Sequence, residues 1–242
     1  MLSSVGSPVT RELLEQNSIL SGLAGSHAAE VLEAGKFVRL KTREKVYDAN
    51  ATIHEALFPI NSVLSIVTEM EDGGAIEVGT VGCEGVSAIP LLLGSTTSAN
   101  GSYCQVPGDA ISLPAALFTQ LSDDNARFRR LLDRYLQAYI NLLGQLAACN
   151  RLHSVYERCA RWLLLTHDRV KSDDLPLTHE FLGMMLGSRR SGVTIAAASL
   201  RTAGFIRYSP GHITILDRPG LEQASCECYV VAQTQFAGLL RS

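Results

Sequence analysis

The sequence lacks any hydrophobic run long enough to cross a bilayer, because even the apolar stretch from Ile89 to Leu93 is short. It also lacks a basic segment followed by an apolar one at the N-terminus, which is the pattern of a secretory signal. Only 19% of the residues are charged, which excludes a disordered charged tail. We therefore expect a cytoplasmic protein with no membrane partner and with reduced thiols. Its 242 residues fit one large domain or two smaller ones.

Familiar catalytic motifs are missing as well. The chain contains no Gly-x-Ser-x-Gly elbow, no P-loop and no His-Glu-x-x-His. His27 and His54 are the only histidines among the first 150 residues, and they are far apart in the sequence. We therefore expect neither an enzyme nor a metal site. The alternative is a cupin-like β-roll, either a metal-binding protein or an enzyme, that carries an accessory helical domain.

The net charge of −3 conceals an uneven distribution. Residues 1–124 hold six basic and fifteen acidic residues, a balance of −9, whereas residues 125–242 hold fifteen basic and nine acidic ones, a balance of +6. Such asymmetry favours two modules with different partners. The other interpretation is that this charge asymmetry has no functional meaning.

Short apolar stretches alternate with turn signals from about residue 36 to residue 115. Asp72-Gly73, Asn100-Gly101 and Pro107-Gly108 are turn sequences, and the apolar residues between them alternate with polar ones. This pattern predicts a small antiparallel β-roll of the jelly-roll type. We assign residues 1–122 to this β-roll domain.

A helical period replaces the strand pattern at residue 123, where Asp123 and Asp124 could cap a helix that extends to residue 150. Apolar residues then recur every three or four positions, as in a coiled-coil seam. A second apolar strip contains Leu131, Ile140, Leu143 and Ala147. Because two strips need two burial surfaces, we expect a dimerisation helix rather than a monomer's core helix. The predicted dimer interface comprises Phe128, Leu132, Tyr135, Tyr139, Leu142, Leu146 and Cys149.

Residues 151–242 are predicted to form a winged helix-turn-helix domain, which gives the whole chain an α+β fold. Two short helices, one beginning near Thr178 and the other at Arg189, are separated by Gly187-Ser188, and a β-hairpin follows Gly204. The start of the second helix would enter the major groove of double-stranded DNA. Two arginines are unfavourable at a helix N-terminus unless an external anion offsets them. The predicted DNA-contacting residues are Thr178, His179, Arg189, Arg190, Ser191, Thr194, Arg207 and His212.

The residues from Leu177 to Val193, Ala203-Gly204-Phe205-Ile206 and the stretch Val78–Gly85 resemble the Crp/Fnr family of bacterial transcription regulators. The resemblance covers nearly the whole chain. It implies a cyclic-nucleotide-binding-like β-roll, a long dimerisation helix and a winged helix that binds DNA as a homodimer. It also implies that Arg190 and Ser191 read bases and that Thr178 contacts a phosphate. A third base-reading position falls near Ile195, which is not basic.

The effector is left open by the sequence. Family members that bind cyclic nucleotides hold the phosphate with an arginine, but residues 94–102 contain no Lys or Arg, so we expect no classical cyclic AMP binding. The remaining candidates for an effector site are Glu84, Gly85, Ser98, Asn100 and Ser102. The alternative is that residues 94–102 form only a surface turn. A β-roll loop is also a candidate contact for RNA polymerase.

The cysteines define no cofactor by their spacing. The first is Cys83, so the N-terminal cluster that binds iron and sulfur in some family members has no candidate ligands here. Cys226 and Cys228 form a close pair with two interpretations, a metal or redox site and simple packing with Leu221 and Tyr229. Cys104, Cys149 and Cys159 are expected to behave as small buried apolar residues.

Overall fold

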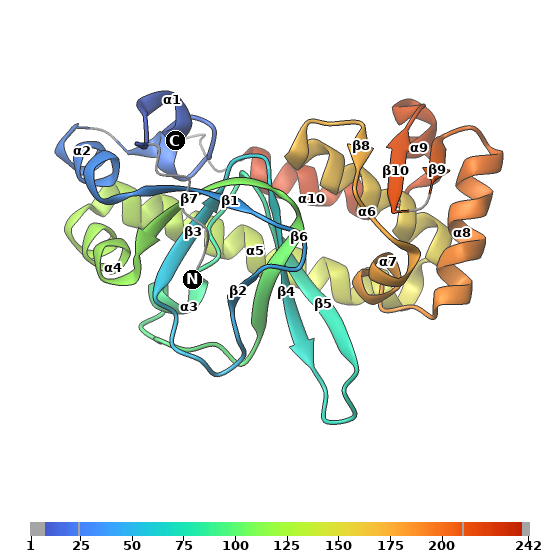
Figure 1. Cartoon of the computed structure of the whole chain (residues 1–242), viewed down its shortest axis with the longest axis horizontal. Coiled ribbons are helices and arrows are strands. Elements are labelled where there is room, and N and C mark those ends of the chain that lie inside the picture. The colour runs from blue at the N-terminus through green and yellow to red at the C-terminus, as the bar shows by residue number, and fades with distance from the viewer. Residues whose placement is uncertain (1–7, 24, 210, 239–242) are drawn as a thin grey trace.

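A computed structural model describes residues 8–23, 25–209 and 211–238. Figure 1 shows a β-roll with short helices at one end, a winged domain at the other, and the long helix α5 passing behind the sheets. The α+β class predicted from the sequence is confirmed. No helix in these ranges is long and apolar enough to span a bilayer.

The β-roll consists of antiparallel strands in two sheets among the described residues. Helices α1, α2, α3 and α4 and a short 3-10 helix, η1, surround it. One sheet has the order β1-β7-β3 and the other has the order β2-β6-β4-β5. The bounds are α1 Arg11–Leu14, η1 Leu20–Gly22, α2 Gly25–Ala34, β1 Lys36–Leu40, β2 Lys45–Tyr47, β3 Glu55–Pro59, β4 Val63–Glu69, β5 Ala75–Val81, α3 Ile89–Leu92, β6 Gly101–Val106, β7 Gly108–Pro114 and α4 Ala115–Asp124.

The long β4–β5 hairpin forms because its turn sequence supplies the required backbone conformation. Gly73 has a φ of 80°, which is the left-handed region that favours glycine. The Asp72 carboxylate accepts a hydrogen bond from the Gly74 amide at 2.9 Å. This hairpin projects beyond the rest of the roll, with its tip at the bottom of the view (Figure 1).

Helix α5 (Ala126–Leu152) begins after both aspartates and extends two residues beyond the predicted end at residue 150. Its cap is Asn125, whose side chain accepts from the amides of Arg127 and Phe128, whereas Asp123 and Asp124 end α4. The cap prediction for the two aspartates is therefore wrong. Asn125 is equally suited to this role, since its side-chain oxygen satisfies the free amides of the first turn.

The predicted dimer seam is the face that α5 buries within its own protomer. Six of the seven predicted residues are buried there, and Leu146 is half-buried. Residues that are already covered have no surface left for a partner, so this part of the prediction is wrong. The β-roll covers the first half of the strip, where the Tyr135 hydroxyl donates to the Val86 carbonyl at 3.2 Å. The buried residues are Phe128, Leu132, Tyr135, Tyr139, Leu142 and Cys149.

The C-terminal half contains a small sheet of order β8-β10-β9 and a group of helices. Helix α6 begins with a capping box in which Ser154 and Glu157 satisfy each other's backbone amides. The bounds are α6 Val155–Val170, β8 Asp174–Leu175, α7 His179–Met185, α8 Arg190–Thr202, β9 Ile206–Ser209, β10 His212–Ile215, α9 Arg218–Ala224 and α10 Cys228–Ala237.

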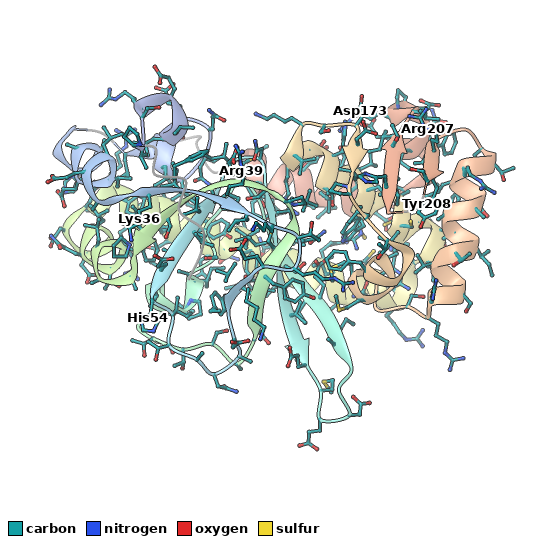
Figure 2. All side chains as sticks on the ribbon, viewed as in Figure 1. Lys36, Arg39, His54, Asp173, Arg207 and Tyr208 are labelled. Carbon is teal, nitrogen blue, oxygen red and sulfur yellow. The ribbon has the colours of Figure 1, made fainter. Side chains whose placement is uncertain are left out.

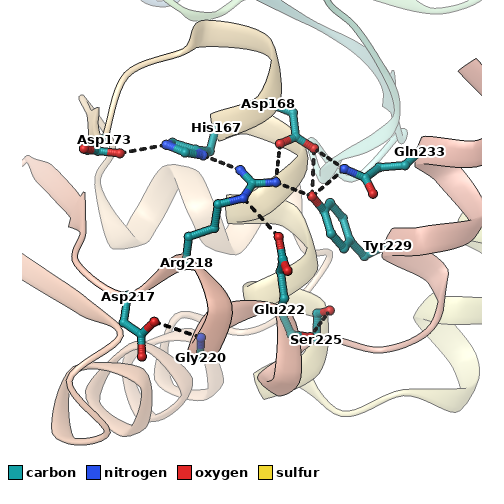
Figure 3. Close-up of polar contacts among 10 residues, drawn as sticks. All are labelled: His167, Asp168, Asp173, Asp217, Arg218, Gly220, Glu222, Ser225, Tyr229 and Gln233. Atoms are coloured by element: carbon teal, nitrogen blue, oxygen red, sulfur yellow. Dashed lines mark hydrogen bonds and ion pairs between the residues drawn. The ribbon is translucent and has the colours of Figure 1, made fainter. Parts of the chain in front are cut away.

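A polar network holds α9 and α10 against α6 (Figure 3). The Arg218 guanidinium lies at its centre and forms an ion pair with Asp168 at 2.7 Å. The same guanidinium donates to the Tyr229 hydroxyl and to His167 Nδ1, both at 2.6 Å. Gln233 of α10 donates to Asp168 at 3.0 Å. These contacts fix the C-terminal helix to the winged domain, while Phe236 further along α10 packs on Tyr135 of α5.

The two halves of the chain meet around the buried carboxyl group of Glu77 on β5. It accepts hydrogen bonds from Ser65 at 2.7 Å and from the Trp162 indole of α6 at 3.2 Å. Met185 of α7 lies against Ser65 at 3.3 Å. Burial raises the pKa of Glu77 to about 7 from its ordinary value of 4.5, although both hydrogen bonds act in the opposite direction.

The raised pKa predicts how stability depends on pH. Between about pH 4.5 and pH 7 the folded protein retains a proton that the unfolded chain has lost, so the free energy of unfolding falls as the pH rises. Glu77→Gln removes this titration. Urea unfolding should therefore find the variant more stable than the unmodified protein at pH 8, by up to about 3 kcal/mol, and nearly equal to it at pH 4.5. The control is Glu69→Gln on the exposed end of β4. A stability difference that is the same at both pH values would contradict the prediction.

Candidate nucleic-acid interface

Helices α7 and α8 form a tight helix-turn-helix. Thr178 caps α7 by accepting a hydrogen bond from the Phe181 amide at 3.2 Å. Gly187 has a φ of 53° in the turn, and Gly183 lets α7 approach the turn closely, because a Cβ there would lie 3.3 Å from the Ser188 carbonyl oxygen. The inward faces of both helices are buried and consist of Phe181, Leu182, Met185, Val193, Ala196, Ala197 and Leu200.

The start of α8 is exposed and strongly positive. Arg189, Arg190 and Ser191 are all exposed, and the first turn contains no acidic residue. The cap residue Arg189 makes no side-chain hydrogen bond to the helix, so the first backbone amides have no partner from their own cap. Two guanidinium groups beside the positive end of the helix dipole create a site suited to an anion. One turn further on, Thr194 and Ile195 lie on the same exposed side of the helix.

The other predicted DNA contacts lie around this helix. Thr178 is exposed at the start of α7, and the side chain of His179 lies outside the described side chains. His212 is exposed and pairs with Ser209, the closing pair of the wing. Arg207 is set back from this turn and donates to Thr214 at 3.4 Å. Figure 2 shows Arg207 at the same end of the winged domain as Asp173, with Tyr208 further along the strand.

Two of the candidate effector residues, Glu84 and Gly85, are in close contact with other parts of the protein. The Glu84 carboxylate forms a bidentate pair with Arg169 of α6, at 2.7 Å and 3.2 Å. Gly85 has no room for a Cβ, because the ring of Tyr135 lies directly against it. A ribose hydroxyl would therefore have to compete with Arg169 for Glu84. No local pattern predicts this contact, because the two residues are separated by 85 positions.

The hydroxyl-rich stretch behaves as a turn between α3 and β6. The Ser98 carbonyl accepts from the Asn50 amide at 2.6 Å, and the Ser98 hydroxyl accepts from the Asn100 amide at 3.1 Å. The Asn100 side-chain oxygen accepts from the Thr68 hydroxyl at 2.8 Å. Ser102 is buried within β6. These contacts stabilise the turn and give no separate support for an effector site.

The Arg169–Glu84 pair yields a test of how the halves are joined. Both side chains are nearly buried, and Arg169 also donates to the Thr80 hydroxyl at 2.6 Å. Arg169→Met would leave the carboxylate of Glu84 without its charged partner, with only the Gly82 amide still donating to it, at a cost of about 3–5 kcal/mol in the free energy of unfolding. Adding Glu84→Gln removes that orphaned charge and should recover much of the loss, as measured by urea unfolding. A double variant no more stable than the single one would disprove the coupling.

Comparisons with known proteins agree with this geometry. Residues 157–224 match the family model of a Crp-like helix-turn-helix domain. Among curated protein sequences, none matches this chain. A structure from Eubacterium rectale, described as a Crp/Fnr-family transcriptional regulator, is similar with a TM-score of 0.66 and 18% identity, covering 87% of this chain and 98% of that one. FixK2 from Bradyrhizobium japonicum has a TM-score of 0.65 and 12% identity, covering 79% and 98%. The CRP-family regulator TTHB099 from Thermus thermophilus has a TM-score of 0.65 and 19% identity, covering 77% and 95%.

Proposed function

We propose that this chain, which has the Crp/Fnr fold and a Crp-like helix-turn-helix domain, is a sequence-specific transcription regulator that binds DNA as a homodimer. The observation that carries the proposal is the exposed Arg189-Arg190-Ser191 start of α8, which has no acidic neighbour in its first turn. A regulator that reads the chromosome works in the cytoplasm. No catalytic role is assigned to any residue.

The chemistry of the α8 surface suggests how it reads a site. The planar guanidinium of Arg190 matches the paired acceptors on the major-groove edge of guanine, and Ser191 can bond to base edges or to phosphate. Arg189, at the cap position, is suited to a backbone phosphate beside the free helix amides. Ile195 is 68% exposed and can contact a thymine methyl group.

The dimer surface that we propose is the face of α5 that the protomer leaves open. Ile140 is 53% exposed, and Gly144, Ala147 and Arg151 follow it at helical spacing on the same side. A Cβ at Gly144 would meet nothing within 4 Å, so a partner helix could approach closely there. If two such helices packed around a two-fold axis, the two α8 helices would be positioned to enter successive major grooves, which are about 34 Å apart.

The sensor function that we propose acts through the contact of Glu84 with Arg169. A ligand of the β-roll that bound Glu84 would compete with Arg169 of α6 for this carboxylate. It would therefore favour a different orientation of the winged domain. No arginine or lysine is available in residues 94–102 for a cyclic phosphate, so we do not propose cyclic AMP as that ligand.

The competing function, a cupin-like β-roll that binds a metal, receives no support from the geometry. Among the described residues, the only group of three or more metal-binding side chains whose ligand atoms converge lies outside the β-roll. His54 lies in the segment before β3, and His27 lies in α2.

Arg190→Ala tests the DNA-reading surface. Binding to a selected DNA site should weaken by about 1–3 kcal/mol, with relaxed preference at one base position, because a bidentate base contact is lost. The measurement is fluorescence anisotropy at several salt concentrations. Lys36→Ala on β1 removes a basic residue at the far end of the molecule and should leave affinity unchanged (Figure 2). Unaltered affinity and unaltered base preference in Arg190→Ala would refute the assignment.

Ile140→Glu tests the dimer surface. A charge at the centre of the open α5 face should shift the protein to monomers in analytical ultracentrifugation, because an unpaired charge is costly to bury between helices. Val230 of α10 is also exposed and apolar, so Val230→Glu is the matched control and should remain dimeric. If both variants remained dimeric, the dimer interface would not be this face of α5.

A further inference from the structure

Three cysteines and one histidine from distant parts of the chain meet at the C-terminal end of α5. Cys149 lies in the last turn of α5, and His153 is the residue that ends this helix, four positions later on the same side. Cys226 lies between α9 and α10, and Cys228 is the first residue of α10. Their four ligand atoms all lie within 4.8 Å of one another.

The distances fit ligands arranged around a single ion. The Sγ atoms of Cys149 and Cys226 are 3.6 Å apart, and Cys228 Sγ lies 3.5 Å from His153 Nδ1. Four ligands placed about 2.0–2.3 Å from a tetrahedral zinc ion are separated from one another by about 3.5–3.8 Å. The sulfur–sulfur distance is well beyond the roughly 2.05 Å of a disulfide, and all four side chains are free of covalent links.

The surroundings orient these groups as a metal site requires. His153 Nε2 lies 3.2 Å from the Glu227 carboxylate, which leaves Nδ1 facing Cys228. A carboxylate that accepts the second N–H of a ligating histidine is the usual outer partner of a metal site. Gln145 donates to Cys228 Sγ at 3.0 Å, a hydrogen bond that stabilises a thiolate. The three cysteines are at most 5% exposed, and His153 is half-buried.

We propose that Cys149, His153, Cys226 and Cys228 bind a divalent thiophilic metal ion, with Zn²⁺ the best match to a closed site of three thiolates and one imidazole. Each cysteine thiol releases its proton to solvent as its sulfur binds the ion, and no oxidant or reductant is needed. Binding at this position would connect the end of α5 to the joint between α9 and α10.

Such a link would fix the position of the proposed DNA-binding half relative to α5. Only the cap residue Ser154 separates His153 from α6. Helix α10 is attached to α6 through Tyr229 and Gln233 (Figure 3) and to α5 through Phe236. A metal ion would add a fixed point between α5 and α10 at the place where the long helix ends. The inference concerns metal binding alone, so it does not depend on DNA binding.

The first experiment is metal analysis of the full chain, purified under reducing conditions without chelator. Mass spectrometry of the elements should find one zinc ion per chain, as the four-ligand set requires. Protein stripped of metal and titrated with Co²⁺ should develop the visible absorption of tetrahedral thiolate-bound cobalt. Protein that holds no metal and gives no such absorption would overturn the proposal. So would an intact mass two hydrogens lighter, since that would show a disulfide in place of free ligands.

Variants separate a metal role from a packing role. Cys228→Ser and His153→Ala should abolish tight Co²⁺ binding, whereas Cys83→Ser, a cysteine of the β-roll, should leave it unchanged. Because loss of a buried cysteine could itself prevent folding, Glu227→Gln provides a milder test at an exposed residue. It should keep the fold and weaken metal affinity by roughly 10–100-fold, since it alters only the partner of His153. Unchanged affinity in a folded His153→Ala protein would refute the site.

Discussion

The arrangement of the two halves depends on the buried ion pair between Arg169 and Glu84. A carboxylate and a guanidinium so deeply buried are stable only when their geometry is good and their remaining donors are satisfied. Both conditions hold here, because the pair is bidentate and Arg169 also donates to Thr80. Since Arg169 lies in the last turn of α6, this contact fixes the helix on which α7 and α8 pack. The same contact occupies the carboxylate that a sensor ligand would need.

Helix α5 connects the two halves of the chain, and its two faces have different surroundings. Its aromatic face lies against the β-roll, where Tyr135 bonds to Val86 and fills the space beside Gly85. Phe236 of α10 packs on the same tyrosine, so the C-terminal helix touches the sensor core directly. The open face, centred on Ile140, remains free for a second protomer. A shift of the roll against Tyr135 would therefore act on α5 and on α10 together.

The sequence predicts what depends on local pattern and fails where distant residues meet. Turn sequences and period identified the β-roll, the long helix and the helix-turn-helix, because those signals act over a few residues. The repeat along α5 correctly indicated a buried face, but a repeat does not say what covers it, and the covering elements come from the same chain. The sequence around Glu84 is consistent with a ligand contact, but it does not show that Arg169 of α6 binds this carboxylate. Cys226 and Cys228 had no second pair nearby, since Cys149 lies 77 positions before Cys226.

The exposure of α8 constrains how DNA binding could be controlled. Ile76, near the tip of the β4–β5 hairpin, contacts Gly187, yet Arg189, Arg190 and Ser191 stay exposed in this arrangement. The start of α8 is therefore not covered by the β-roll of its own chain. A dimer binds tightly only when its two α8 helices match the spacing and direction of successive major grooves. That spacing depends on the joint at His153 and Ser154, where α5 ends and α6 begins. The contacts that hold this joint, Arg169 with Glu84 on one side and the cysteine–histidine cluster on the other, are thus where a signal would have most effect.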